Sequence, residues 1–120
     1  MTMSLSKIFY KVENHLLKQN ERSVTSVTSG EYCRYRSEEG LSCAVGCLMT
    51  DDIYDYSLEG GSARDFDVVE ALAPIIGVSP TIHRAKKIDL LHRLQAIHDG
   101  DRVDTWADKL SEVKLDFNIS

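Results

Sequence analysis

Apolar residues return at the helical period in four parts of the chain. In residues 4–19 they recur every three or four positions, with lysine, glutamate and asparagine side chains between them, which is the pattern of an amphipathic helix. Ser4 stands directly before this pattern, where a hydroxyl can cap the first turn. The same periodicity predicts further helices at 62–73, 88–98 and 102–113.

Capping and helix-breaking residues set the limits of the second helix. Ser62 is followed three residues later by Asp65, which is the arrangement of a capping box at a helix start. Pro74 cannot sit in an undistorted helix interior, so we expect the helix to kink or end near Ala73. Gly77 suits a C-terminal stop.

The stretch 32–61 departs from the helical pattern and predicts a β-hairpin. Residues 32–36 alternate in side-chain character, and residues 37–40 (Ser-Glu-Glu-Gly) suit a turn. Residues 41–43 can then pair back on the first segment. A hairpin of this size is stable only if it packs on the rest of the domain.

Three other segments are less regular. Residues 43–49 fit either a continued strand or a short helix capped by Ser42, and we favour the helix because alanine, leucine and methionine favour it. Residues 21–30 are small and polar and predict a connector, either a loop throughout or a loop with a few extended residues. The tail 115–119 alternates, so it would add a short strand or pack on the core.

The sequence predicts a single domain over residues 1–120, because it contains no repeat, no change of composition and no long linker. The predicted fold class is α+β, as a mainly α-helical domain with a small antiparallel β-hairpin.

Length and composition narrow the function classes. The 120 residues are 42% hydrophobic and 28% charged, which is typical of a soluble globular domain. No apolar run approaches the roughly 20 residues that a membrane span needs, and the N-terminal residues show no signal-peptide pattern. We therefore expect a cytoplasmic protein without a membrane partner. The net charge of −5 argues against nucleic-acid binding, which needs a positive field.

The cysteines Cys33, Cys43 and Cys47 bear on metal binding. Their odd number argues against a disulfide framework, so we expect buried thiols. Zinc prefers four ligands in two close pairs, which this spacing does not supply. We assign no metal ligand and no cofactor, and a zinc-stabilised structural module stays open as an alternative.

A nucleophilic Cys43 is a second alternative. If Ser42 caps a helix here, the helix dipole would lower the pKa of the Cys43 thiol. His92 or His98, the latter beside Asp99, would then supply the base. Nothing in the sequence brings these groups together, so we assign no catalytic residue and do not expect an enzyme.

An acidic and aromatic stretch follows the cysteines. Residues 51–70 hold seven acidic side chains and one basic side chain, Arg64, and they suit either a solvated face or contact with a basic partner. Arg34 and Arg36 suit a protein interface, a phosphate or a carboxylate, or internal ion pairs with the acidic stretch. The candidate binding residues are Tyr32, Arg34, Arg36, Asp51, Asp52, Tyr54, Asp55 and Glu59.

Several short motifs resemble a family of small phage and prophage proteins. In that family a C-x-Y-R hairpin leads into G-x-x-C-A-V-G-x-L, then an acidic D-x-x-Y and an E-G pair. The matching segments of this chain are 33–36, 40–48, 51–54 and 59–60, and residues 91–99 with Trp106 and Leu110 are similar to the downstream half. The family often has a proline where this chain has Thr50.

The resemblance implies a bacteriophage origin and a compact domain, and it supplies no activity. Phage genes of this kind often act on host machinery. We therefore expect a non-enzymatic accessory protein in the host cytoplasm that binds and modulates a host protein, in host takeover or in inhibition of antiviral defence. The alternatives are a small enzyme or ligand-binding protein, using Cys43 with a histidine or Arg34 and Arg36 on a phosphate, and the zinc-stabilised module. Homo-oligomer formation stays open.

Overall fold

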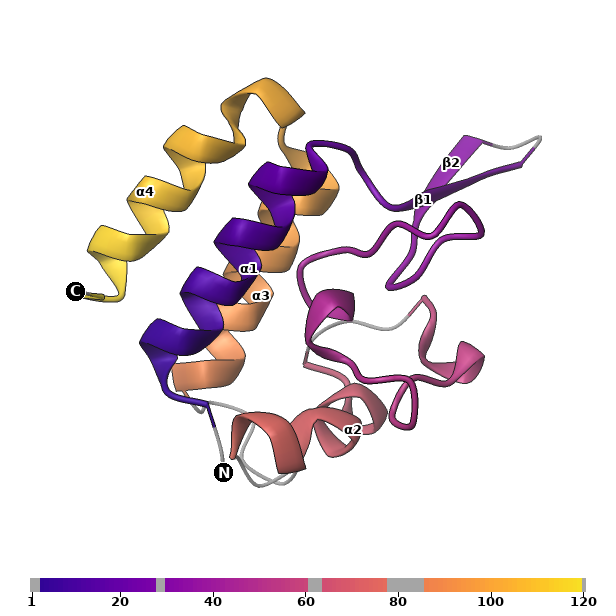
Figure 1. The fold of residues 1–120 in the computed structure, drawn as a ribbon, viewed down its shortest axis with the longest axis horizontal. Coiled ribbons are helices and arrows are strands. Elements are labelled where there is room, and N and C mark those ends of the chain that lie inside the picture. The colour runs from indigo at the N-terminus through magenta and orange to yellow at the C-terminus, as the bar shows by residue number, and fades with distance from the viewer. Residues whose placement is uncertain (1–2, 28–29, 61–63, 78–85, 120) are drawn as a thin grey trace.

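Four α-helices carry the fold in the computed structural model, which describes residues 3–27, 30–60, 64–77 and 86–119. Helices α1, α3 and α4 pack against one another (Figure 1). Helix α2 lies near the N-terminal end of α1, where the backbone N–H of Met3 donates to the carbonyl of Ile75 at 3.0 Å. The helices are α1 (Leu5–Gln19), α2 (Phe66–Ile76), α3 (Lys86–Gly100) and α4 (Trp106–Asp116).

Helix α1 forms where the sequence predicts it. The side-chain oxygen of Ser4 accepts the backbone N–H of Lys7 at 3.2 Å, as an N-cap does. The helix ends at Asn20, which has φ of 53° and donates its backbone N–H to the carbonyl of Leu16. The buried face consists of Ile8, Phe9, Val12 and Leu16, so the predicted amphipathic pattern is confirmed.

The end of α2 corrects one prediction. Pro74 lies inside the helix, which continues to Ile76. Of the two predicted alternatives, a kink or an end near Ala73, the end is therefore wrong. Proline removes one helix hydrogen bond, and near a C-terminus the remaining turn can still close. Gly77, at φ of 75°, donates its backbone N–H to the carbonyl of Ala73 and closes it.

The other helix limits differ from the predicted ones by a few residues. Helix α2 begins after Asp65, whose side chain makes no capping hydrogen bond, and the expected cap Ser62 lies outside the described residues. Helix α3 is longer than 88–98 at both ends. Helix α4 begins later than residue 102, because a 3₁₀ turn, η3 (Val103–Thr105), precedes it.

The C-terminal tail packs on the core and forms no strand as far as residue 119. Ile119 is buried and belongs to the hydrophobic core. Its backbone N–H donates to the carbonyl of Lys114 at 3.0 Å, while Asn118 adopts φ of 53°. This left-handed residue turns the chain back over the last turn of α4, so the alternation in the tail does not lead to strand pairing.

The two paired strands overlap the segment where the sequence predicts a hairpin only at residues 32 and 33. Strands β1 (Val24–Val27) and β2 (Gly30–Cys33) are antiparallel, and β1 falls in the expected connector 21–30. The ribbon extends away from the helices (Figure 1). Val24 and Cys33, whose side chains are described, lie outside the hydrophobic core.

The hairpin predicted at residues 32–43 does not form. Beyond the end of β2, the described chain contains a single isolated bridge in this segment, between Arg36 and Ser42. The backbone N–H groups of Tyr35 and Arg36 donate to the Glu59 carboxylate instead of to a second strand. The α+β fold class is therefore wrong, because the helices and the coil before α2 build the core of a mainly helical domain.

The coil 34–60 completes the core beside α1. It contains two single 3₁₀ turns, η1 (Gly46–Leu48), which packs on α1, and η2 (Tyr56–Leu58). The short helix favoured for residues 43–49 is therefore reduced to one 3₁₀ turn. The coil contributes Tyr35, Cys43, Ala44, Val45, Leu48, Met49 and Leu58 to the core.

Helix length bears on the expectation of no membrane partner. Helices α1 and α3 have 15 residues each. Within the described ranges, none of the helices combines the length and the apolar character needed to cross a bilayer.

Candidate functional site

The carboxylate of Glu59 joins the two halves of the predicted site. It accepts the backbone N–H groups of Tyr35 and Arg36 at 2.8 and 3.1 Å and the hydroxyl of Tyr54 at 2.5 Å. The Nε of Arg34 lies 3.4 Å from the same carboxylate, and the two side chains are only 12% and 8% exposed. Glu59 therefore fixes the loop that carries it to the backbone of residues 35 and 36 and to the side chain of Arg34.

The two predicted arginines have different environments. The guanidinium carbon of Arg34 lies 5.0 Å from the centre of the Tyr56 ring, and its ion pair with the Glu59 carboxylate is nearly buried. Arg36 lies 4.6 Å over the Tyr54 ring, and its side chain is 29% exposed. Arg34 thus makes the internal ion pair that the sequence left open, whereas Arg36 keeps access to solvent.

The acidic candidates other than Glu59 remain on the surface. Asp51 lies 2.8 Å from Nη1 of Arg36, although its own side chain is 98% exposed. Asp52 is exposed beside it. Asp55 caps η2 by accepting the backbone N–H of Ser57 at 2.9 Å, and this hydrogen bond lowers the pKa of its carboxyl group.

The tyrosines of this region differ in exposure: Tyr54 is bonded to Glu59, whereas Tyr56 faces solvent. Partial burial and the contact with Glu59 raise the pKa of the Tyr54 hydroxyl, whereas Tyr56 is 71% exposed. The side chain of Tyr32 lies outside the described part of the chain. Contacts link five of the eight predicted binding residues, and Tyr56 is an exposed aromatic residue of the same loop that the sequence analysis did not select.

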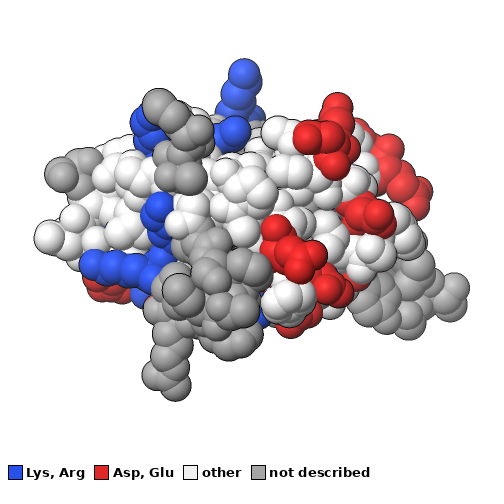
Figure 2. Space-filling view, turned by 90° about the horizontal axis from the view of Figure 1, so that it is seen from below, with Lys and Arg blue, Asp and Glu red and all other residues white. Residues whose placement is uncertain are grey.

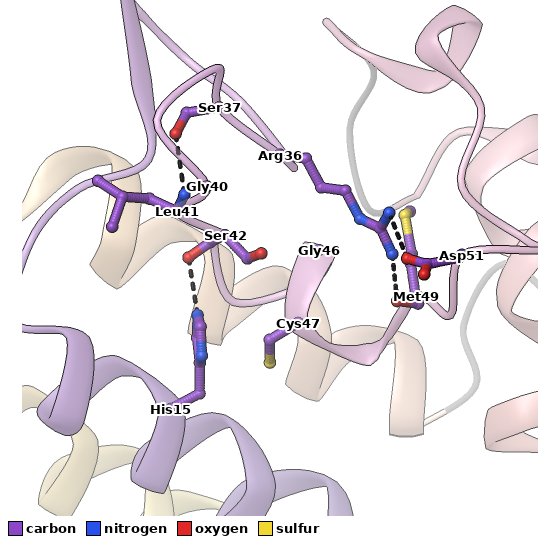
Figure 3. A pocket seen from close by; sticks show the side chains of 10 residues that line it. All are labelled: His15, Arg36, Ser37, Gly40, Leu41, Ser42, Gly46, Cys47, Met49 and Asp51. Carbon is purple, nitrogen blue, oxygen red and sulfur yellow. Dashed lines mark hydrogen bonds and ion pairs between the residues drawn. The ribbon is translucent and has the colours of Figure 1, made fainter.

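A pocket of about 460 Å³ lies beside Arg36 (Figure 3). His15 of α1 forms one wall, with its Nε2 2.8 Å from the carbonyl oxygen of Ser42. Arg36 and Asp51 form the opposite wall. His15 could not be selected from the sequence, because it is 27 residues from its partner and belongs to an ordinary amphipathic helix.

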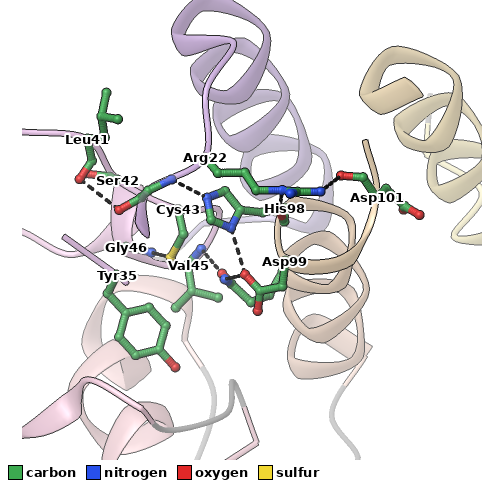
Figure 4. A network of polar contacts seen from close by, with 12 residues as sticks. Arg22, Tyr35, Leu41, Ser42, Cys43, Val45, Gly46, His98, Asp99 and Asp101 are labelled. Atoms are coloured by element: carbon green, nitrogen blue, oxygen red, sulfur yellow. Dashed lines mark hydrogen bonds and ion pairs between the residues drawn. The ribbon is translucent and has the colours of Figure 1, made fainter. Parts of the chain in front are cut away.

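The environment of Cys43 is not that of a nucleophile. Cys43 is fully buried, and burial raises the pKa of its thiol far above the ordinary range. The backbone N–H of Gly46 donates to its sulfur at 3.3 Å (Figure 4). Burial also raises the pKa of Cys47 to about 12, although Lys11 lowers it in part. Thiols that keep their protons at neutral pH are weak nucleophiles.

His98 lies beside Asp99 at the C-terminal end of α3 (Figure 4). Its ring is fully buried, and Nε2 accepts the backbone N–H of Ser23 at 2.9 Å. The ring proton is therefore on Nδ1, which lies 2.7 Å from the Asp99 carboxylate. Burial alone would raise the pKa of Asp99, but hydrogen bonds from His98, Cys33 and Gln95 together lower it.

Cys33, His98 and Asp99 form the one group with metal-ligand spacing among the described residues, since their donor atoms lie within 4.8 Å of one another. Both ring nitrogens of His98 are already engaged. A metal on Nδ1 would move the proton to Nε2, where it would face the N–H of Ser23, and a metal on Nε2 would displace that N–H. The group therefore does not fit a metal ion, and Cys43 and Cys47 are not part of it.

Other polar contacts between residues far apart along the chain could not be predicted from the sequence either. The side-chain oxygen of Gln95 accepts the backbone N–H of Val45 at 2.9 Å, and Gln19 bonds both backbone groups of Ser42. His98 had a weak signal, because it follows Leu94 by four residues on the apolar face of its helix.

Comparison of the chain with protein families, with curated proteins and with solved structures finds no match.

Proposed function

We propose that the protein is a non-enzymatic binding protein whose acidic loop, residues 51–60, docks on a basic surface of a partner protein. The observation that carries this proposal is that Glu59 fixes the loop while the other three carboxylates of the loop and one tyrosine stay exposed. A loop that is already ordered loses little conformational entropy on binding, and tyrosine is enriched among the residues that dominate interface energies. These carboxylates and this tyrosine are Asp51, Asp52, Asp55 and Tyr56.

The charge distribution supports a basic partner. Figure 2 shows acidic side chains gathered mainly on one half of a face, with most of the lysine and arginine side chains on the other half. Asp65, Asp67 and Glu70, at and near the start of α2, add exposed negative charge after the acidic loop. Complementary charge speeds the encounter of two proteins and selects against partners of the same sign.

The chemistry of the thiols supports a non-enzymatic role. Burial raises the pKa values of Cys43 and Cys47, and both nitrogens of the His98 ring are occupied. The thiol–histidine pair considered for Cys43 would need a lowered thiol pKa and a free ring nitrogen.

The resemblance to phage and prophage proteins supplies the setting of the proposal. In that setting the partner is a protein of the bacterial host, the complex forms in the host cytoplasm, and its effect is host takeover or inhibition of antiviral defence.

A pull-down from bacterial host lysate tests the proposal. The test variant combines Asp52→Lys with Tyr56→Ser, two exposed positions of the acidic loop. The matched control combines Asp108→Lys with Leu115→Ser, two exposed positions on α4 at the other side of the molecule (Figure 1). Circular dichroism checks that both variants are folded.

We expect the native protein and the α4 variant to capture the same host protein in a constant ratio, and the loop variant to lose it. The captured protein should carry a basic surface, so capture should weaken between low and high salt. Capture by the loop variant at the native level, or loss by the α4 variant alone, would show that the interface is elsewhere.

A further inference from the structure

The guanidinium of Arg36 lines the pocket, and contacts other than its ion pair with Asp51 hold it in place. Nη2 of Arg36 donates to the carbonyl of Met49 at 2.9 Å. Its guanidinium lies over the Tyr54 ring, and its backbone N–H is bound by Glu59 at 3.1 Å. Two contacts therefore orient the guanidinium before any ligand arrives, and the third holds the backbone that carries it. A group that is already oriented loses little conformational entropy on binding.

The ionic partner of Arg36 is easily displaced. Asp51 contacts Nη1 at 2.8 Å, but its side chain is 98% exposed. Ion pairs at such exposure contribute little to stability, because water solvates the separated carboxylate almost as well. The neighbouring pair of Arg34 and Glu59 differs, since both its members are nearly buried. An incoming anion can replace Asp51 but not Glu59.

The pocket has the size and a second donor for such an anion. Its volume of about 460 Å³ falls in the range of roughly 300–1,000 Å³ that is usual for small-molecule sites. Ser37 also lines the pocket, and its Oγ accepts the backbone N–H of Leu41 at 3.1 Å; a hydroxyl group can donate its proton while its oxygen accepts. Arginine and hydroxyl donors on one pocket suit the planar carboxylate and the phosphate group.

We infer that this pocket is a binding site for the carboxylate or phosphate group of a small molecule, which displaces Asp51 and pairs with the guanidinium of Arg36. Asp51 then acts as an intramolecular competitor that occupies the arginine in the free protein. The inference does not depend on the partner proposed above, because small anions and the isolated protein are sufficient to test it.

The test is a titration of ¹⁵N-labelled protein with sodium acetate and, separately, with inorganic phosphate, at constant ionic strength. Amide signals and the Nε–H signal of Arg36 are followed by NMR. We expect saturable shifts at the pocket residues with at least one of the two anions. A response to acetate alone assigns the site to carboxylates, a response to phosphate alone assigns it to phosphates, and a response to both defines a general oxyanion site.

Three variants separate a site from general charge attraction. Asp51→Asn removes the competitor and should lower the dissociation constant about twofold to fivefold, the equivalent of an exposed ion pair. Glu38→Gln makes the same charge change at an exposed residue that does not line the pocket, and it should change the constant less than about 1.5-fold. Arg36→Lys keeps the charge but loses the planar fork, and it should weaken binding at least about threefold.

Two results would overturn the inference. One is the lack of saturable shifts with either anion in both the native protein and Asp51→Asn. The other is an equal effect of Asp51→Asn and Glu38→Gln, which would reduce the binding to nonspecific attraction.

Discussion

At the scale of single residues, the Glu59 carboxylate accepts backbone hydrogen bonds that a neighbouring β-strand would accept in the predicted hairpin. The backbone N–H groups of residues 35 and 36 need acceptors, and a carboxylate at 2.8 and 3.1 Å satisfies both. A charged acceptor forms stronger hydrogen bonds than a carbonyl group. Because Arg34 and Tyr54 bind the same carboxylate, one side chain fixes the coil that presents the acidic loop.

Glu59→Gln should lower the free energy of unfolding by about 3 kcal/mol, as when one member of a buried ion pair is lost. The amide can accept fewer of the backbone N–H groups, and Arg34 is left nearly buried without its anion. Urea unfolding measures the change. Asp51→Asn, which removes an exposed ion pair, should cost less than about 1 kcal/mol, and equal losses in the two variants would contradict this role of Glu59.

The buried thiol of Cys43 and the partly buried thiol of Cys47 give a second prediction for single residues. With a pKa of about 12, Cys47 is a thiolate in on the order of one molecule in 10⁴ at pH 8. A thiol reagent should therefore label Cys47 and Cys43 in the folded protein far more slowly than in urea, as peptide mapping by mass spectrometry would show. The labelling rate of Cys47 should rise about tenfold per unit between pH 8 and 10. Rapid labelling of the folded protein at pH 8 would show that these thiols are accessible.

At the scale of elements, the helices could be predicted because their signal is local. The four buried apolar residues of α1 recur at the helical period within 15 residues, and the capping hydroxyl of Ser4 directly precedes the helix. The hairpin could not be predicted correctly, since the partner of the backbone at 35 and 36 is a side chain more than 20 residues away. The alternating side-chain pattern of residues 32–36 indicated an extended backbone, but it did not indicate that Glu59 would accept its hydrogen bonds.

The 3₁₀ turn η1 depends on a glycine. A Cβ at position 46 would lie 2.0 Å from the carbonyl oxygen of Tyr35, and a backbone atom cannot yield as a flexible side chain does. Gly46→Ala should therefore lower the free energy of unfolding by about 3 kcal/mol, the upper range for overpacking.

The matched control for this prediction is Gly100→Ala at the end of α3. A Cβ there meets nothing within 4 Å, so the change should be neutral or stabilising by up to about 1 kcal/mol. Thermal and urea unfolding compare the two variants. Similar stabilities of both would mean that η1 does not lie as close to Tyr35 as the structure places it.

At the scale of the whole molecule, the contacts of His98 join distant parts of the chain. Its ring binds the backbone of Ser23, and Arg22 donates from Nε to the carbonyl of His98 at 3.1 Å. The base of the β-ribbon is thereby attached to the end of α3. The residue types of this cluster and of the candidate binding site could be read from the sequence, but their contact partners could not. In the His98 cluster the partners are 75 or more residues apart along the chain.

This cluster predicts a dependence on pH. The pKa of Asp99 is lowered in the folded protein, so its carboxylate stabilises the fold above its ordinary pKa of about 3.9, and this contribution is lost as the pH falls through the lowered value. Asp99→Asn should lower the urea midpoint at pH 6 and have a smaller effect at pH 2.5. The same offset at both pH values would show that the carboxylate charge does not stabilise the cluster.

The proposed function requires the acidic loop to touch a partner protein. The most direct test replaces Tyr56 by the photo-crosslinking residue p-benzoylphenylalanine and irradiates the protein in host lysate, with the same replacement of Leu115, which is 80% exposed on α4, as the control. We expect one host protein with a basic surface to be cross-linked from position 56 and not from position 115. Cross-linking from position 115 alone, or equally from both positions, would contradict the claim.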